Sequence, residues 1–324
     1  MKSNLGFWKK LKKPILALAP MADVTDSAFR QVILKRGKPS IFFTWFVSAD
    51  GLSSKKGKKN LLKDLYFTES ERPIVAQIFG AKPENIFQAA KLVKKLGFDG
   101  LDINMGCPDK KILKQGAGGA LIKNPALAKE IILAAQKGAG NLPISVKTRL
   151  GFDSDILNEW LPVILKTNPA AITIHVRTVK ELSGVPARWE RIGEAVKIRN
   201  KYKSNALIIG NGDVKDLKDA FQKAKKYKAD GIMLGRSAFG NPWIFNEKIK
   251  KENLSREKIF QALLEHALLF KKIYPRRNFA VMKKHFASYI SGFSGAKEIR
   301  SRLMESKTAS ESVSVLKSFL ERLK

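Results

Sequence analysis

Short apolar runs rich in β-branched residues alternate with amphipathic stretches through the first three quarters of the chain. Eight such runs predict strands, at residues 15–19, 41–46, 74–79, 100–105, 144–150, 171–176, 206–210 and 231–235. Apolar residues at three- and four-residue spacing predict helices between them, at residues 84–97, 124–138, 189–202 and 214–227. Strands that alternate with helices in this way indicate a parallel sheet.

The number of strand–helix units favours a closed (β/α)8 barrel, the TIM barrel, for which about 250 residues is typical. A doubly wound open sheet is the main alternative, but it usually has fewer strands and a glycine-rich first turn. The first turn here reads PMADVTD instead. We therefore expect an α/β fold with a TIM-barrel catalytic domain over residues 1–245.

The pattern changes after residue 246, where no strand-like run occurs. Three amphipathic stretches predict helices, at residues 257–274, 278–293 and 310–324. Residues 246–324 contain 18 Lys and Arg and 8 Glu, so their net charge is +10. We expect a C-terminal all-helical domain with a basic surface; a helical extension packed on the barrel is the alternative.

The formal net charge of the whole chain is +32, from 61 Lys and Arg against 29 Asp and Glu. Such a surface attracts phosphate groups, and nucleic acid is the commonest large anion in a cytoplasm. The lysines are spread over the whole chain, however, so charge alone is also compatible with a merely solvated surface. No apolar run approaches the ~20 residues that cross a bilayer, which argues against a membrane protein.

Cysteine and histidine are scarce, with 1 Cys and 3 His in 324 residues. This count excludes an intrachain disulfide framework and argues against a metal centre. Free cysteine is typical of a reducing compartment, so we expect a cytoplasmic protein.

Polar and reactive side chains recur where the predicted strands end, which is where TIM barrels carry their active sites. They are Gln77, Asn104, Cys107, Lys147, Arg149, His175, Arg177, Asn211, Asp213 and Arg236. A strand end is often polar because the chain emerges into water, and this explains any single position. Pro20-Met21-Ala22 follows the first predicted strand, so seven of the eight strand ends carry candidate site residues, which this explanation accounts for poorly.

Two glycine-containing turns follow the last two predicted strands. GNGD (210–213) precedes a helix expected to begin near Val214, and GRSAFGNP (235–242) contains Arg236. Glycine lets backbone N–H groups approach an anion closely, and a helix N-terminus favours negative charge. Loops at this point of TIM barrels frequently bind phosphate. The pair of turns therefore predicts a cofactor that carries a phosphate group.

Cys107 lies in a Gly-Cys-Pro turn, where we expect a reactive nucleophile or acid rather than a buried small apolar residue. The glycine- and lysine-rich residues 109–125 predict a mobile cationic lid. Lys147 lies in an otherwise apolar strand, so it requires an anionic or electron-rich partner. His175 is either a hydrogen-bond donor to a cofactor carbonyl or a core histidine.

Seven motifs recur in a familiar order along most of the chain. They are PMADVTDSAFR (20–30), NMGCPDKKILKQGAGGAL (104–121), SVKTR (145–149), HVRT (175–178), GNGD (210–213), MLGRSAFGNPWIF (233–245) and MKKHFASY (282–289). Together they resemble the tRNA-dihydrouridine synthases of bacterial and archaeal type, and NMGCP is the most specific of them. Gly119 departs from the family pattern, in which we expect serine at that position.

The resemblance implies an FMN-binding TIM barrel with a helical tRNA-binding domain at residues 246–324. It implies reduction of the C5–C6 double bond of specific uridines in tRNA to 5,6-dihydrouridine, with NADPH (or NADH) as the reductant. Hydride would pass from FMN N5 to C6, and Cys107 would give the proton to C5. We expect a cytoplasmic monomer that binds tRNA and neither a membrane nor a metal.

The resemblance also assigns the remaining site residues. Those implied to bind the cofactor are Pro20, Met21, Ala22, Gln77, Lys147, His175, Asn211, Gly212, Asp213, Gly235 and Arg236. Those implied to contact the target base are Asn104 and Arg177.

Two other functions stay open at this point. An FMN-dependent dehydrogenase acting on a free pyrimidine, similar to dihydroorotate dehydrogenase, would share the barrel and the phosphate loops but would not require a charge of +32. A non-catalytic RNA-binding protein on a decayed barrel would be colourless when purified. The sequence does not specify which tRNA uridine is modified.

Overall fold

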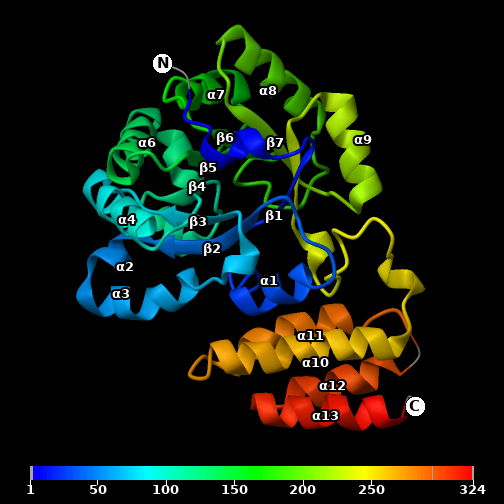
Figure 1. Ribbon diagram of the computed structural model, residues 1–324. Helices are drawn as coiled ribbons and strands as arrows, with labels where there is room; N and C mark the ends of the chain where they lie inside the picture. The colour runs from blue at the N-terminus through cyan, green and yellow to red at the C-terminus, as the bar shows by residue number, and fades with distance from the viewer. Residues whose placement is uncertain (1–2, 294, 323–324) are drawn as a thin grey trace. The chain divides into compact units, whose positions relative to one another are not determined.

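The computed structural model describes residues 3–293 and 295–322, and a ring of parallel strands dominates its first 235 residues (Figure 1). The strands are β1 (Ile15–Leu18), β2 (Phe42–Ser48), β3 (Ile74–Phe79), β4 (Gly100–Met105), β5 (Ile144–Arg149), β6 (Ala171–His175), β7 (Leu207–Asn211) and β8 (Gly231–Leu234). They form one eight-stranded sheet over the described residues, in the order β1-β8-β7-β6-β5-β4-β3-β2.

The two ends of this sheet meet. Ala17 in β1 forms a parallel bridge with Ile41, which directly precedes β2. The Leu18 backbone N–H donates to the Ile41 carbonyl oxygen at 3.3 Å. The strands therefore close into a barrel, and the predicted TIM-barrel fold is confirmed.

The described helices cover the barrel and form the C-terminal region. The α-helices are α1 (Ser27–Leu34), α2 (Ala49–Ser53), α3 (Lys55–Leu61), α4 (Pro83–Lys95), α5 (Lys110–Lys114), α6 (Pro125–Ala139), α7 (Leu157–Leu165), α8 (Glu190–Lys201), α9 (Leu217–Tyr227), α10 (Arg256–Ile273), α11 (Lys283–Tyr289), α12 (Ala296–Glu305) and α13 (Ala309–Arg322). The 3-10 helices are η1 (Gly6–Lys10), η2 (Leu62–Leu65), η3 (Glu69–Glu71), η4 (Gly118–Lys123), η5 (Arg236–Ala238), η6 (Lys251–Asn253) and η7 (Phe279–Met282). In the part of the chain that the structure describes, none of these helices combines the length and the apolar character that a membrane span needs.

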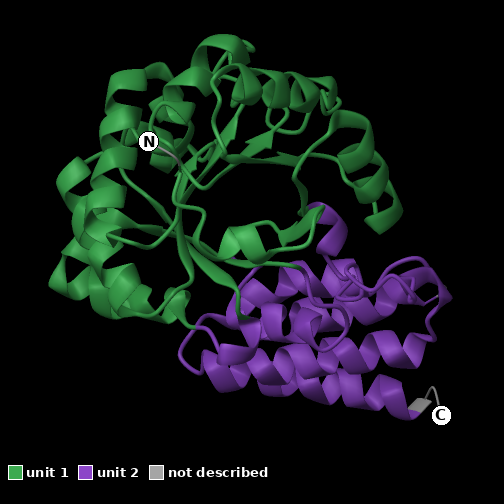
Figure 2. Ribbon diagram, turned by 45° about the horizontal axis from the view of Figure 1, so that its top comes forward, with its two compact units in different colours: residues 1–20, 40–66, 72–235 green, residues 21–39, 67–71, 236–324 purple. Residues whose placement is uncertain are grey.

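The chain divides into two compact units, which are coloured separately in Figure 2. Unit 1 consists of residues 1–20, 40–66 and 72–235, and unit 2 consists of residues 21–39, 67–71 and 236–324. Helix α1 and the short segment around η3 thus belong to the helical unit, although they lie early in the sequence. The domain boundary predicted between residues 245 and 246 stays a prediction.

In unit 1, the wall of the barrel follows from the two-residue period of its strands. On β4, Leu101 and Ile103 are fully buried and point to one face, against α4 and α6. Asp102 and Asn104 point to the opposite face, toward the inside of the barrel. Apolar residues therefore fix the helices outside, while this strand presents polar groups inward.

Unit 2 is a helical bundle with its own apolar core. Helix α10 packs against α1 and α13, and its buried side chains include Phe260, Leu263 and Phe270. The helix predicted over residues 278–293 is shorter than expected, since it divides into η7 and α11. The C-terminal helical region is confirmed, with α12 as an additional helix that the sequence pattern did not indicate.

Candidate active site

One hydrogen bond shows which side chains face the inside of the barrel. The Lys147 amine on β5 donates to Asn211 Oδ1 on β7 at 3.3 Å. Strand β6 lies between these two strands, so their side chains can meet only across the inner, concave side of the ring. Residues in register with them share that side, including Asn104 beside Lys147 and His175 beside Asn211.

Below this contact the barrel contains a buried polar cluster rather than the bulky apolar layers usual for the fold. Asp102 accepts from Gln77 Nε2 at 2.6 Å and from Ser145 Oγ at 2.5 Å. Gln77 Oε1 in turn accepts from Asn104 Nδ2 at 3.0 Å. Burial raises the pKa of Asp102 to about 6, against the opposing effect of these hydrogen bonds and of the Lys147 charge. The cluster ties three neighbouring strands together in one geometry.

Asn104 connects this cluster to the loop that carries the cysteine. Asn104 Oδ1 accepts from the backbone N–H groups of Gly106 at 3.1 Å and Cys107 at 2.9 Å. The Cys107 carbonyl oxygen accepts from the Gly119 N–H at 3.0 Å. Hydrogen bonds on both sides therefore fix the Cys107 backbone at the C-terminal end of β4. The predicted contact of Asn104 with a base stays a prediction.

The Cys107 thiol is half-buried and protonated at neutral pH. Burial raises its pKa above the ordinary value, and the nearby Asp109 carboxylate acts in the same direction. The charges of Lys147 and Arg149 act in the opposite direction. Arg149 bonds to the carbonyl oxygen of Gly106, next to Cys107, and Lys147 is in register with Asn104, which bonds to the Cys107 N–H. A protonated thiol beside two cations is suited to donate a proton to a group that acquires negative charge.

The segment 109–125, which we expected to be a mobile lid, contains two short helices. It forms α5, which Asp109 caps through the backbone N–H of Lys111, and then η4. Its side chains Ile112 and Ala117 are buried together with Phe79 of β3. Apolar residues spaced through the segment anchor it to the barrel wall, so it is helical rather than an open loop, and its role as a mobile cationic lid stays a prediction.

Lys147 is a half-buried cation without an ion pair. Its amine contacts the neutral Asn211 amide, and no carboxylate of the described residues forms a salt bridge with it. Burial, followed by the like charge of Arg149, lowers the pKa of Lys147 to about 8. Arg149 itself donates to the carbonyl oxygens of Gly106 at 2.9 Å and Thr178 at 2.8 Å. Lys147 is thus the cation that remains available to a ligand.

Arg177 and His175 lie at the end of β6. The Arg177 guanidinium pairs with Asp213, and it contacts His175 Nε2 at 3.2 Å and the Val185 carbonyl oxygen at 2.6 Å. The structure therefore brings Arg177, which we expect to contact the target base, together with His175 and Asp213, which we expect to contact the cofactor. Their individual ligand contacts stay predictions.

The turn after β7 has a backbone that requires glycine. Gly212 has φ of +125°, and a Cβ there would meet His175 Cδ2 at 3.1 Å. The Gly212 carbonyl oxygen accepts from Trp189 Nε1 at 2.8 Å, which fixes the turn. The helix that follows, α9, begins at Leu217 with Asp216 as its own cap, so the start expected near Val214 is wrong. After β8, Gly235 leads directly into η5, which begins at Arg236.

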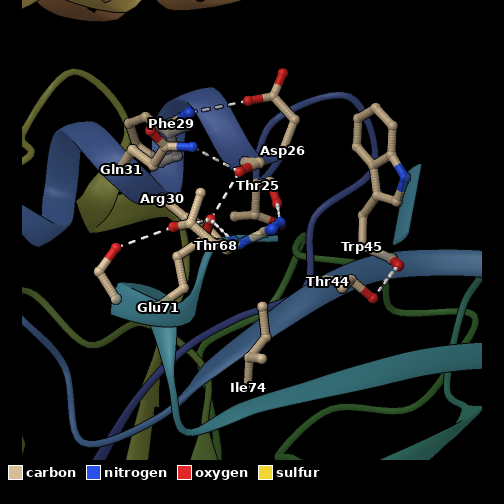
Figure 3. Close-up of polar contacts among 12 residues, drawn as sticks. Thr25, Asp26, Phe29, Arg30, Gln31, Thr44, Trp45, Thr68, Glu71 and Ile74 are labelled. Atoms are coloured by element: carbon tan, nitrogen blue, oxygen red, sulfur yellow. Dashed lines mark hydrogen bonds and ion pairs between the residues drawn. The ribbon is translucent and has the colours of Figure 1, made fainter. Parts of the chain in front are cut away.

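Met21 and Ala22 belong to unit 2, where a buried network holds their segment (Figure 3). Thr25 Oγ1 accepts from the Met21 N–H at 2.9 Å and donates to the Met21 carbonyl oxygen at 3.2 Å. Arg30 donates to the Thr25 carbonyl oxygen at 2.8 Å and to Glu71 Oε2 at 2.5 Å. Arg30 and Glu71 are both fully buried. The network connects the Met21 backbone to an ion pair in the interior of unit 2.

Comparison with known proteins now adds to this geometry. The family model described as Dihydrouridine synthase (Dus) matches residues 17–324. The chain belongs to the dihydrouridine synthase family. Its relatives include "Probable tRNA-dihydrouridine synthase 2" of Bacillus subtilis (strain 168), which is 43% identical over 97% of this chain and 96% of the relative. "Probable tRNA-dihydrouridine synthase" of Staphylococcus aureus (strain COL) is 40% identical over 98% of this chain and 96% of the relative.

Solved structures of other proteins share the fold of this dihydrouridine synthase family member. An old yellow enzyme homologue from Zymomonas mobilis has a TM-score of 0.53 at 13% identity, over 75% of this chain and 90% of its own. An amine oxidase from Pseudomonas geniculata N1 has a TM-score of 0.54 at 13% identity, over 73% of this chain and 47% of its own. At this identity the likeness concerns the barrel architecture.

Two charged residues of this dihydrouridine synthase family member, Asp102 and Glu71, were missing from the predicted candidates, and Arg149 was selected at a strand end without a role. Asp102 organises the inner cluster, Arg149 holds the Cys107 loop, and Glu71 pairs with Arg30. An aspartate within the apolar run GLDINM was a usable signal, since buried Asp is rare unless it is hydrogen-bonded. The described residues contain no group of three or more His, Cys, Asp or Glu side chains that could hold a metal ion.

Proposed function

We propose that the protein is a tRNA-dihydrouridine synthase that reduces the C5–C6 double bond of uridine in tRNA, with FMN as cofactor and NADPH as reductant. Membership of the family and the names of the relatives support the substrate. The observation that carries the proposal for the site is the placement of the half-buried Cys107 at the end of β4, bonded to Asn104, whose register partner Lys147 reaches into the barrel without an ion pair.

The residues at the mouth fit a flavin with a phosphate. Lys147 is an unneutralised cation inside the barrel, and burying such a charge is costly unless an anionic or electron-rich group compensates it. The glycine turn at Gly212 permits close approach of a ligand to the backbone. We propose that the cofactor contacts are Pro20, Met21, Ala22, Gln77, Lys147, His175, Asn211, Gly212, Asp213, Gly235 and Arg236.

A flavin held by these residues and reduced by NADPH would supply the hydride that adds to C6 of uracil. Cys107 Sγ then donates its proton to C5, and the resulting thiolate regains a proton from solvent. Because burial raises the pKa of the thiol, Cys107 is in the donating form at neutral pH. The Lys147 ammonium stabilises negative charge that develops on the ring next to it.

The RNA must present its uridine outside the base stack. Swinging a stacked nucleotide into a pocket costs a few kcal/mol. Contacts between phosphates and a protein of net charge +32 offset this cost. We propose that Asn104 and Arg177 contact the extruded base, that the helical C-terminal region contributes to tRNA binding, and that the enzyme acts as a monomer where tRNA matures, in the cytoplasm.

The test is to map dihydrouridine in tRNA from cells with and without the gene, and to assay the purified protein on unmodified tRNA transcript, orotate and uracil. We expect a yellow protein, loss of dihydrouridine at defined positions without the gene, and turnover of the transcript alone. Turnover of a free pyrimidine but not of tRNA would support the dihydroorotate dehydrogenase-like alternative. A colourless protein that binds RNA without reducing it would overturn the enzymatic proposal.

A further inference from the structure

A groove in unit 1 lies outside the residues assigned above. It has a volume of about 600 Å³ and is formed by α2 and α3 on one side and by α4 on the other. Figure 1 shows the three helices side by side. Its polar lining includes Ser53, Lys55, Lys58, Asn85 and Gln88. We propose that this groove binds the phosphodiester backbone of RNA next to the uridine that enters the barrel.

The composition of α3 is the first argument. The helix reads KKGKKNL, and none of its residues is buried. Lys55 lies three and four residues from Lys58 and Lys59, spacings at which like charges destabilise a helix. No ion pair joins Lys55, Lys56, Lys58 or Lys59 to a carboxylate of the described residues. A self-repelling helix with no buried side chain gains stability from a bound polyanion.

The second argument is that the chain holds α3 in a fixed position. Ser48 Oγ accepts from the Gly51 N–H at 3.1 Å, and Ser54 Oγ accepts from the Gly57 N–H at 3.0 Å. A Cβ at Gly57 would collide with the Gly51 carbonyl oxygen. Two capping serines and a close glycine–glycine approach thus present the lysines to the groove from a defined scaffold.

The opposite wall, formed by α4, offers the amides of Asn85 and Gln88 together with one acid, Glu84. Asn85 Nδ2 donates to Asp50 Oδ1 at 2.6 Å, which positions the amide at the edge of the groove. Gln88 is exposed one turn further along α4. Glu84 is the acidic residue of the lining, against Lys55 and Lys58. Amides beside two lysines suit ribose hydroxyls and phosphates, which are the groups that RNA presents along its backbone.

The third argument is location within the barrel. Helix α2 begins directly after Ser48, the last residue of β2, and α4 begins at Pro83, shortly after β3 ends. The groove therefore lies at the C-terminal ends of β2 and β3. Cys107 follows the C-terminal end of the next strand, β4, so both are on the same rim of the ring. An RNA strand whose uridine reaches Cys107 therefore approaches the rim on which this groove lies.

The test compares two lysine pairs in the full-length holoenzyme. Lys55→Gln with Lys58→Gln removes two charges from the groove. The control, Lys94→Gln with Lys95→Gln, removes two exposed charges from the last turn of α4, at the other end of the same helix. The probe is an unmodified tRNA transcript, with Kd measured at several salt concentrations and kcat and KM measured for dihydrouridine formation.

We expect the groove variant to raise Kd and KM roughly tenfold at moderate salt, to leave kcat unchanged, and to reduce the slope of log Kd against log salt by about 1 to 2. The control pair should change Kd less than about twofold. Equal effects of the two pairs, or none in either, would overturn the proposal.

The proposal takes tRNA from the proposed function, and the two can fail separately. If the unaltered enzyme binds the transcript but forms no dihydrouridine, the proposed reaction fails, while the Kd comparison still tests the groove. If dihydrouridine forms and the groove variant binds and reacts normally, the reaction stands and the groove proposal fails.

Discussion

The inner cluster of unit 1 and a histidine pair in unit 2 both consist of buried polar side chains, but only the cluster satisfies them with hydrogen bonds. Both carboxylate oxygens of Asp102 accept hydrogen bonds inside the barrel. In unit 2, His266 and His285 are fully buried with ring centroids 4.4 Å apart, and none of their four ring nitrogens has a hydrogen-bond partner among the described residues. They pack against aromatic rings, including Phe29 at 5.3 Å from His266 and 5.0 Å from His285.

The presence or absence of hydrogen bonds distinguishes the barrel cluster, whose side chains are held in position for a ligand, from the histidine pair, which only fills the core of unit 2. Satisfied polar groups hold one geometry, and a buried group without a partner costs about 1–3 kcal/mol. Burial lowers the pKa of His285 to about 3 and that of His266 well below its usual value, so both rings are neutral. We infer that the barrel cluster positions Cys107 for chemistry, whereas the histidine pair acts as two bulky aromatic groups.

Cys107→Ala tests the catalytic half of this comparison and has the largest expected effect. Loss of a general acid lowers a rate by about 10² to 10⁴-fold. Because Cys107 is half-buried and its backbone supplies the hydrogen bonds of the loop, stability should change little. The measurement is the rate of dihydrouridine formation at saturating tRNA and NADPH.

Flavin content and tRNA affinity serve as the controls for Cys107→Ala, and both should match those of the unaltered enzyme. A normal rate with normal binding would remove Cys107 from the acid role. Loss of flavin would instead indicate that the thiol supports the cofactor site.

Glu71→Gln tests the contribution of the buried Arg30–Glu71 pair to the stability of unit 2, and it has the second largest expected effect. It removes the carboxylate paired with the fully buried Arg30 guanidinium, and breaking a buried ion pair typically costs about 3–5 kcal/mol of unfolding free energy. Glu265→Gln is the matched control in the same unit, since Glu265 pairs with Arg36 at 2.8 Å while partly exposed. The control should cost less than about 1 kcal/mol. Urea unfolding measures both, and equal losses would contradict a special role for the buried pair.

The same buried contacts explain what the sequence could and could not predict. The strand runs and most helices were predictable because they depend on local periodicity, as for residues 74–79 and β3, which coincide. Local pattern contains no signal for the pairing of Arg30 with Glu71, which are 41 residues apart. That long-range pairing, together with the packing of α1 on α10, assigns residues 21–39 to unit 2.

Within the candidate site, residue type and position at strand ends were enough to select Cys107, Lys147 and Asn211. They were not enough to show that Asn104 and Gln77 bond to one another, since this depends on strand register. Asp102 was missed for the same reason: the run GLDINM has the hydrophobicity of a buried strand, and only the closed ring gives its aspartate an inner face.

The double variant His266→Phe with His285→Phe tests whether the histidine pair only fills space. Its expected effect, on the pH dependence of the free energy of unfolding, is the smallest of the three. The folded-state pKa values of both histidines lie below the unfolded value of about 6.5, so below that pH the unfolded chain binds protons that the folded chain does not. The free energy of unfolding should therefore decrease as the pH is lowered, by up to about 1.4 kcal/mol per pH unit for each histidine. Phenylalanine keeps a planar aromatic ring at each position and removes the titratable nitrogens, and with them this dependence.

Other groups around the pair shape the same profile. Arg36 and Lys284 add positive charge that further disfavours protonation of the histidines. Asp26, also in unit 2, changes stability with pH in the opposite direction through its own titration. Burial raises the pKa of Asp26 to about 6, so the folded chain binds its proton first and gains stability as pH falls through that value. Urea unfolding at pH 7.5, 6 and 5 should show a smaller loss of unfolding free energy on acidification in the double variant than in the unaltered protein. Each single variant should lie between these two. Identical profiles would show that the pair is protonated or solvated in the folded chain, and the contrast with the barrel cluster would fail.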